Sequence, residues 1–523
     1  MKPQSRSLFP ILVIIIVLVA VSAPYFYANR AGGEAYVFGG FLINPLDGNS
    51  YLAKMYQGWQ GAWRYQLAFT PDPGEGAYLF LFYLFLGHLA RWLNAPLLLV
   101  FHLARLLGAL TLLIVLWRFC VSLFSKTRTR RWAYALVALG SGIGWLLIPF
   151  GAFTADFWVA EAYPFLSAFA NPHFTFGLAL VLWQVIPVAR RWWARALAAL
   201  LLSVINPFGI VIVLIVLGGT LGVRILLDRL GGASPQRRTP LLSLVAVLLG
   251  GLPVLVYDVW VTYTNPVFAA WDAQNLTPSP PWWDTLVSLS PALLLALVGA
   301  GWLIRQQIRT EENTPSALTE QSWLIPIVWA GLGLVLLYLP FSLQRRFMMG
   351  LYVPLAVLAV VGFDALAKNQ NRFRQGMILV LTLSLLTNLI VLFSGLYGAR
   401  THDLAIYLTA GEADALAWIE ENTPEEALIL ASPEMGMFIP GHTGRRVLYG
   451  HPFETVDAEE QEQALIDFFE VSGDDHFLSE RGVDYIFYGP RERGLGEFSI
   501  PGLKPIFSSE DVELYRWGDC QCD

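Results

Sequence analysis

Charged residues are scarce in this chain, and their scarcity excludes most classes of soluble enzyme. Only 14% of the 523 residues are Asp, Glu, Lys or Arg, whereas 55% are hydrophobic. A soluble globular domain normally carries about 25% charged residues. The apolar runs reach the roughly 20 residues that a helix needs to cross about 30 Å of hydrocarbon. The sequence therefore predicts a multi-pass membrane protein.

Cysteine is nearly absent as well, with three in the whole chain. Cys120 lies in an apolar run, and Cys520 and Cys522 form a Cys-x-Cys pair near the C-terminus. This set favours neither a disulfide framework nor a metal site. No small-residue cleavage site follows the first apolar run, so we expect that run to remain as an uncleaved anchor.

Basic residues are few in the last part of the chain. Residues 403–523 hold 26 acidic and 7 basic residues, a net charge of −19, whereas residues 1–402 hold 14 and 27, a net charge of +13. This asymmetry predicts a membrane module, 1–402, joined to an acidic domain, 403–523. Nucleic acid is not an expected partner, because phosphate backbones bind basic surfaces.

The apolar runs predict about eleven transmembrane helices. We expect them at 8–28, 97–124, 132–150, 173–189, 193–206, 208–227, 240–260, 286–304, 322–340, 347–366 and 375–397. The run 77–93 is shorter and contains His88 and Arg91, so we predict an interfacial helix there.

The distribution of Lys and Arg predicts on which side of the membrane each loop lies. With a cytoplasmic N-terminus, 19 Lys and Arg of the module fall on the cytoplasmic side, as the positive-inside rule requires. The loops 29–96 and 151–172 and the domain 403–523 are then extracytoplasmic. Long loops of this kind are usually functional. In the domain 403–523, helix and strand signals alternate, which predicts a small α/β fold.

The segment "NPLDGNSYLAKM" of the first outer loop carries a single acid, Asp47. It stands just before a helical pattern in which Tyr51, Met55, Gly58 and Trp59 share one face. Two readings of Asp47 are open, and they are compatible. The side chain could cap the helix through an Asx turn, or it could be a functional carboxylate kept at the membrane surface.

Two further polar groups face the same side of the membrane. The second outer loop holds Asp156 and Glu161 and is followed by His173, a set that is either a polar rim or part of a site. Arg345 and Arg346 lie at the outer end of a predicted helix, against the charge bias. Paired guanidinium groups suit a phosphate, although basic side chains also extend towards lipid head groups.

These features together resemble the GT-C superfamily of membrane glycosyltransferases. The similarity consists of one N-terminal span, a long outer loop with the Asp of "NPLDGNSYLAKM", a second acidic outer loop and an extracytoplasmic C-terminal domain. Oligosaccharyltransferases, protein O-mannosyltransferases and lipid A aminoarabinose transferases belong to this superfamily. The resemblance implies a hexosyl- or pentosyltransferase of the cell membrane. Its donor would be a polyprenyl-phosphate sugar, and its acceptor a glycan, lipid or protein.

The resemblance also implies roles for individual residues. Asp47 matches the catalytic acid of the first outer loop and would act as general base. Asp156 and Glu161, with His173, occupy the place of the second acidic site, which in oligosaccharyltransferases helps to hold a divalent metal. This loop lacks the Asp-x-Asp motif of that family, so these three residues would either hold a divalent metal, Mg²⁺ or Mn²⁺, or bind the acceptor.

Other residues would complete the site. The pair Arg345 and Arg346 would stabilise the donor phosphate as it leaves. Further candidate substrate contacts in the first outer loop are Lys54, Trp59, Trp63, Tyr65 and Glu75. The aromatic members of this group are also typical of residues that lie among lipid head groups.

Two other classes of function are alternatives to an enzyme. A transporter or flippase of lipid-linked sugars commonly has paired repeats, and the Pro-interrupted segment 203–211 has no clear counterpart elsewhere in the chain. A non-catalytic membrane scaffold would make the acids of the outer loops dispensable.

Overall fold

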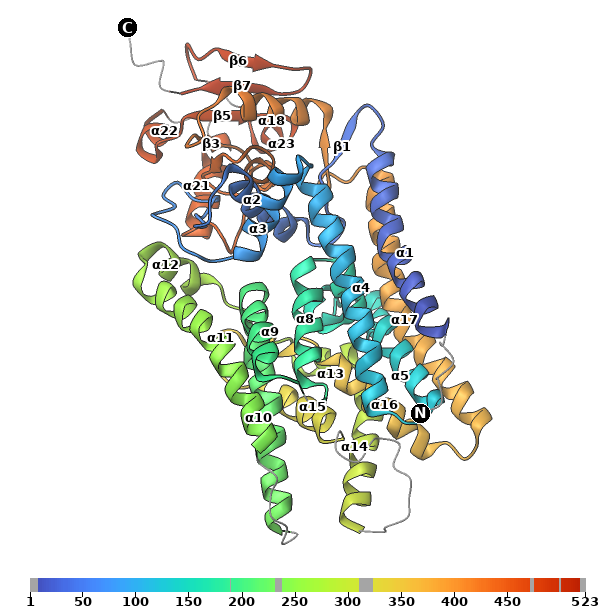
Figure 1. Cartoon of the computed structure of the whole chain (residues 1–523). Coiled ribbons are helices and arrows are strands. Elements are labelled where there is room, and N and C mark those ends of the chain that lie inside the picture. The colour runs from blue at the N-terminus through green and yellow to red at the C-terminus, as the bar shows by residue number, and fades with distance from the viewer. Residues whose placement is uncertain are drawn as a thin grey trace. The chain divides into compact units, whose positions relative to one another are not determined.

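The structure is a computed structural model that describes residues 8–188, 190–230, 238–309, 323–470, 475–497 and 500–517. Cys520 and Cys522 lie outside these residues. The described chain is mainly helical with a small C-terminal sheet, which confirms the predicted fold class (Figure 1). Within it, six helices are long and apolar enough to cross a membrane, or seven if the bent pair α13 and α14 forms one span.

The six long helical stretches are α1 (Leu8–Ala31), α4 (Leu97–Leu123), α5 with η1 (Thr127–Leu139 and Gly144–Phe150), α10 (Phe208–Leu230), α11 (Arg238–Thr264) and α17 (Gln370–Thr401). The bent pair is α13 (Trp282–Ser288) and α14 (Ala292–Arg309), which meet at an angle of 84°. The shorter apolar helices are α3 (Leu81–Leu93), α8 (Pro172–Val185), α9 (Trp192–Ile205), α15 (Leu324–Leu336) and α16 (Tyr352–Leu366).

A helix occurs in each of the eleven predicted ranges, but four of these helices are short. The ranges 173–189, 193–206, 322–340 and 347–366 hold helices of 14, 14, 13 and 15 residues. Residues 352–362 of α16 are all buried. A helix buried in protein on every side is apolar all round, so hydropathy alone does not separate it from a span.

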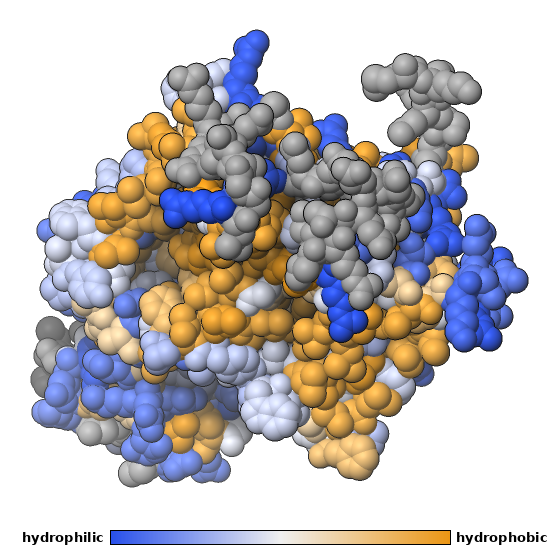
Figure 2. All heavy atoms as spheres, turned by 90° about the horizontal axis from the view of Figure 1, so that it is seen from below, coloured by the Kyte–Doolittle hydropathy of each residue, from blue (hydrophilic) through white to orange (hydrophobic). Residues whose placement is uncertain are grey.

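Large apolar side chains remain exposed along the long helices. On α1 they are Leu8, Ile11, Leu12, Ile15, Ile16 and Val19. Figure 2 shows hydrophobic side chains spread over much of the face that it views. Exposed apolar surface on this scale is typical of contact with lipid chains.

The contacts divide the chain into two compact units. Unit 1 comprises Met1–Ala23, Leu103–Val256 and Thr277–Ser394, and unit 2 comprises Pro24–His102, Tyr257–Leu276 and Gly395–Asp523. The first loop (29–96) thus belongs to the same unit as the acidic domain. The predicted domain boundary between residues 402 and 403 stays a prediction. The contacts show in addition that the first loop packs with the acidic domain.

Unit 2 contains a five-stranded sheet with the order β4-β3-β5-β7-β6. Its strands are β3 (Leu428–Leu430), β4 (Arg446–Val447), β5 (Tyr485–Tyr488), β6 (Pro505–Ser508) and β7 (Glu513–Arg516). β4, β3 and β5 are parallel, whereas β7 and β6 are antiparallel to their neighbours. All residues of β3 and β5 are buried, as in strands covered on both faces. The α/β fold predicted for this region is confirmed.

The helices of this domain are α18 (Ala410–Asn422), α19 (Pro433–Gly436), α20 (Ile439–Thr443), α21 (Ala458–Glu470), α22 (Asp475–Arg481) and α23 (Pro490–Leu495). The remaining short helices of the chain are α6 (Ala155–Trp158), η2 (Ala160–Ala162), α7 (Pro164–Phe169), α12 (Pro266–Gln274) and η3 (Gln344–Met348).

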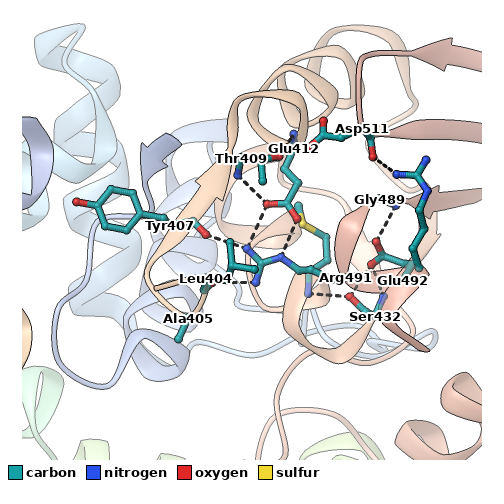
Figure 3. Close-up of polar contacts among 12 residues, drawn as sticks. Leu404, Ala405, Tyr407, Thr409, Glu412, Ser432, Gly489, Arg491, Glu492 and Asp511 are labelled. Atoms are coloured by element: carbon teal, nitrogen blue, oxygen red, sulfur yellow. Dashed lines mark hydrogen bonds and ion pairs between the residues drawn. The ribbon is translucent and has the colours of Figure 1, made fainter. Parts of the chain in front are cut away.

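A buried ion pair, Arg491–Glu412, connects the segment that follows α17 to the acidic domain. The Arg491 guanidinium donates to Glu412 at 2.8 Å and to the backbone carbonyls of Leu404 and Tyr407 at 2.9 and 2.8 Å (Figure 3). Both charged side chains are almost fully buried. The carboxylate of Glu412 also accepts from the Thr409 amide, which closes a capping box at the start of α18. These satisfied donors and acceptors indicate a structural role.

The first loop joins unit 2 through a strand and two helices. β1 (Tyr36–Phe38) pairs antiparallel with β2 (Tyr407–Thr409). α2 (Pro45–Gln60) packs against both α3 and α20. A Cβ at Gly58 would lie 2.1 Å from the Leu84 carbonyl oxygen, and one at Gly87 1.9 Å from that of Met55. These two glycines therefore allow α2 and α3 to approach backbone to backbone.

Candidate active site

The first turn of α2 holds the predicted catalytic acid. Asn44 is the N-cap, with a left-handed backbone (φ 46°), and Pro45 follows at the first helical position. Asp47 stands within the first turn instead of capping it, so the capping reading of its side chain is wrong. Gly48 lies within α2, and its missing side chain leaves room for the Phe41 ring, since a Cβ there would lie 2.3 Å from that ring.

The carboxylate of Asp47 is held from two sides. The Asn44 side-chain amide donates to Oδ2, while Oδ1 lies 3.4 Å from Nε2 of His451. The Asp47 side chain is 37% exposed and that of His451 only 2%. A carboxylate that is oriented yet accessible can accept a proton from a bound hydroxyl.

One face of α2 carries a buried polar network. Lys54, which is fully buried, donates to Oε1 of Glu454 at 2.6 Å and to the Ser50 hydroxyl at 2.6 Å. Ser50 and Tyr65 also donate to Glu454, at 2.5 and 2.9 Å. Burial raises the pKa of the Glu454 carboxyl, but the charge of Lys54 and the hydrogen bonds from Lys54 and Ser50 outweigh burial and hold that pKa below the usual value.

The predicted substrate contacts of the first loop fall into two groups. Lys54 and Tyr65 are buried and bonded to Glu454. The other three are exposed: Trp59, Trp63, which stacks on His88 at 4.1 Å, and Glu75, which pairs with Arg64 at 3.7 Å. All five roles stay predictions, and the accessible group is the better placed to meet a substrate or lipid.

In unit 1, the second loop (151–172) contacts Arg345 and Arg346, the pair predicted to bind phosphate. Arg346 lies 3.4 Å from Oε1 of Glu161, and the Arg345 guanidinium lies over the Trp158 ring at 4.9 Å. The backbone N–H of Gly350 donates to the Glu161 carbonyl at 2.8 Å. The structure therefore brings Arg346 to Glu161, 185 positions earlier in the chain, and Arg345 to Trp158 of the same loop.

Asp156 has a different environment from Glu161. Its side chain is fully buried, and its carboxylate accepts from Thr154 at 2.6 Å, Thr387 at 2.8 Å and the Gly144 amide at 3.0 Å. Burial raises the pKa of this carboxyl to about 6, against the lowering effect of its hydrogen bonds. His173 packs against Phe174 with ring centroids 4.0 Å apart.

Two residues of the acidic domain were missed by the sequence reasoning, His451 and Glu454. Their partners on α2 lie about 400 positions earlier, so no local pattern connects them. The one available signal was the spacing of Asp47, Ser50 and Lys54. Steps of three and four residues put these side chains on one face of a helix.

Comparison with solved structures shows the fold to which this arrangement belongs. The oligosaccharyltransferase of Archaeoglobus fulgidus, tethered to an acceptor peptide, matches 92% of this chain and 69% of its own with 13% identity and a TM-score of 0.56. The same protein in complex with zinc and sulfate matches 91% and 68% with 13% identity and a TM-score of 0.50. The chain shares the fold of this oligosaccharyltransferase, in agreement with the fold that its resemblance to the GT-C superfamily implies.

ArnT from Cupriavidus metallidurans, bound to undecaprenyl phosphate, matches 96% of this chain and 98% of its own with 14% identity and a TM-score of 0.48. No protein-family model matches the sequence, and no curated protein is significantly similar to it. The likeness to the oligosaccharyltransferase is one of fold, at an identity too low to carry over an activity by itself.

In the part of the chain that the structure describes, the acidic residues and histidines do not gather into a metal centre. Among the described residues, no three His, Cys, Asp or Glu side chains gather as a group that could hold a metal ion. The oxygens of Asp156 are taken by hydrogen-bond donors, and the carboxylate of Glu161 is paired with Arg346. The predicted Mg²⁺ or Mn²⁺ does not fit this donor set, and no step below depends on it.

Proposed function

We propose that this chain is a membrane glycosyltransferase that moves a sugar from a polyprenyl-phosphate donor to an acceptor on the outer face of the membrane. The observation that carries the proposal is the accessible, two-sided placement of Asp47 on a GT-C fold. The related oligosaccharyltransferase structure holds an acceptor peptide. The chain's acidic domain lacks the Trp-Trp-Asp motif of that family, which argues against protein N-glycosylation.

In the proposed reaction, the acceptor hydroxyl gives its proton to Asp47 while its oxygen attacks the anomeric carbon of the sugar. The bond between that carbon and the phosphate oxygen breaks, and the polyprenyl phosphate leaves with the electron pair. The leaving phosphate needs charge stabilisation more than a proton, and Arg345 and Arg346 would supply this stabilisation.

The location of the site on the outer face is inferred from the distribution of Lys and Arg among the loops. A cytoplasm-only reporter that is active after Asp523 would contradict it.

Cells that lack the protein are expected to accumulate one polyprenyl-phosphate sugar, because the step that consumes this donor is missing. Mass spectrometry of extracted lipids measures the pool and names the sugar. The wild-type gene should return the pool to its normal size, whereas an Asp47→Asn gene expressed to the same level should not. A lipid-linked sugar pool that is unchanged by the deletion would argue against transfer from such a donor.

Replacement of Arg345 and Arg346 by Gln is expected to weaken donor binding by roughly tenfold to a hundredfold, since charge-assisted hydrogen bonds to the phosphate are lost. Binding of undecaprenyl phosphate to the purified protein, followed by tryptophan fluorescence, provides the measurement. Arg345→Gln alone separates phosphate binding from the Arg346–Glu161 ion pair. Arg30→Gln, at the exposed end of α1, is the control. Equal affinity in all variants would remove the pair from the site.

A further inference from the structure

The tautomer of His451 follows from its surroundings. The backbone N–H of Phe453 donates to Nδ1 of His451 at 3.1 Å, so Nδ1 carries a lone pair. In the neutral ring the remaining proton is then on Nε2, the atom that lies 3.4 Å from Oδ1 of Asp47. This distance exceeds that of a mature N–H···O hydrogen bond, as is common for catalytic contacts before substrate binds.

The turn that carries His451 is itself fixed against α2. The backbone amides of Glu454 and Thr455 donate to the His451 carbonyl at 3.2 and 2.9 Å, which closes the turn. Three residues after His451, Glu454 is locked by Lys54. The ring of His451 also packs against Phe69 with centroids 5.7 Å apart. The imidazole therefore has little freedom to turn away from Asp47.

We propose that His451 is a positioning residue for Asp47, so that the acidic domain supplies part of the active site. The inference rests on the proposed function of Asp47 as general base. In this proposal the 3.4 Å contact shortens to a hydrogen bond from Nε2–H to Oδ1 when substrate binds, and together with donation from Asn44 to Oδ2 it holds the carboxylate plane in one orientation. An oriented carboxylate meets the acceptor hydroxyl without the entropic cost of a rotating one.

The test compares two replacements of His451 in the full-length protein. His451→Phe keeps a ring but removes the donor, and we expect turnover to fall by about tenfold to a hundredfold. His451→Gln keeps an N–H at the end of the side chain and should restore most of the rate. The assay follows release of undecaprenyl phosphate by mass spectrometry from a panel of synthetic undecaprenyl-phosphate hexoses and pentoses. Membranes of the deletion strain serve as the acceptor source.

A control and a double variant distinguish positioning from a structural role. His442→Phe replaces another histidine of unit 2, a half-buried one in α20, and should leave the rate unchanged. If His451 acts through Asp47, adding His451→Phe to Asp47→Asn should lower the residual rate no further, because interacting residues are not additive. Full activity of His451→Phe, equal losses in the Phe and Gln variants, or an additive loss in the double variant would overturn the inference. Normal activity of Asp47→Asn would instead overturn the proposed base.

Discussion

The Asp47→Asn variant is expected to transfer sugar a hundredfold to ten-thousandfold more slowly than the wild-type protein, because it lacks the carboxylate that accepts the acceptor's proton. Its fold should be preserved. The N-cap of α2 is Asn44, and the new amide oxygen can still accept from the Asn44 side chain. The measurement is initial rate in the undecaprenyl-phosphate sugar assay, with heat unfolding of the same preparation as a check on folding.

Comparison with Asp47→Ala sharpens this result. If the side chain only supports the first turn of α2, Asn should be nearly silent and Ala should cost about 0.3–1 kcal/mol, since an acid is favourable near a helix N-terminus. If Asp47 is the base, both variants should be slow. Near-normal transfer by the Asn variant would refute the assignment, and it would also fit a non-catalytic scaffold.

The second large effect is expected at the buried Lys54–Glu454 pair. Glu454→Ala should lower the free energy of unfolding by about 3–5 kcal/mol, because it leaves a fully buried ammonium group without its counter-charge. Lys54→Met should cost less, since Ser50 and Tyr65 still donate to the carboxylate. Heat unfolding and hydrogen exchange at the 451–455 turn measure both changes.

Two comparisons make this prediction specific. Lys54→Met combined with Glu454→Leu should recover most of the stability, because the replacement of a whole buried pair by apolar residues is often neutral. Glu459→Ala, an exposed acid of α21, should change little. If Glu454→Ala and Glu459→Ala changed the free energy of unfolding by the same amount, the Lys54–Glu454 pair would not stabilise the fold.

The Lys54–Glu454 pair also makes the free energy of unfolding depend on pH. The pKa of Glu454 is lower in the folded protein than its ordinary value of 4.5. The folded state therefore favours the ionised form, and the contribution is complete above about pH 4.5. It is lost as the pH falls through the lower pKa of the folded state. The wild-type protein should lose stability in acid more steeply than the Lys54→Met/Glu454→Leu variant.

Much of the fold was predictable because hydropathy and periodicity are local signals. The apolar runs and the alternation of helix and strand after residue 403 were enough to indicate a membrane module and an α/β domain. The three-residue strands β1 and β2 were not foreseen, since they are stabilised only by pairing with each other across the chain. The N-cap could have been found, because Asn-Pro before a helical pattern places Asn at the cap and Pro at the first position.

The site was predictable only in its individual acids and bases. Charge bias singled out Arg346, and burial cost singled out Glu161, but neither signal states that the two side chains meet. His451 lies in an acidic domain with no motif around it, and its relation to Asp47 exists only in three dimensions. Contacts over such separations depend on the whole packed unit rather than on any window of sequence.

The packing of α2 against the acidic domain has a consequence for the synthesis of the protein. Lys54 leaves the ribosome 400 residues before Glu454, which at about 5–20 residues per second is roughly 20–80 s. Throughout that interval the first loop has a cationic, aromatic-lined face with nothing to cover it. A chain released by a ribosome that stalls after the membrane helices would have Lys54 without Glu454 and Asp47 without His451. Completion of synthesis, rather than insertion of the helices, is thus the event that allows the Lys54–Glu454 pair to form.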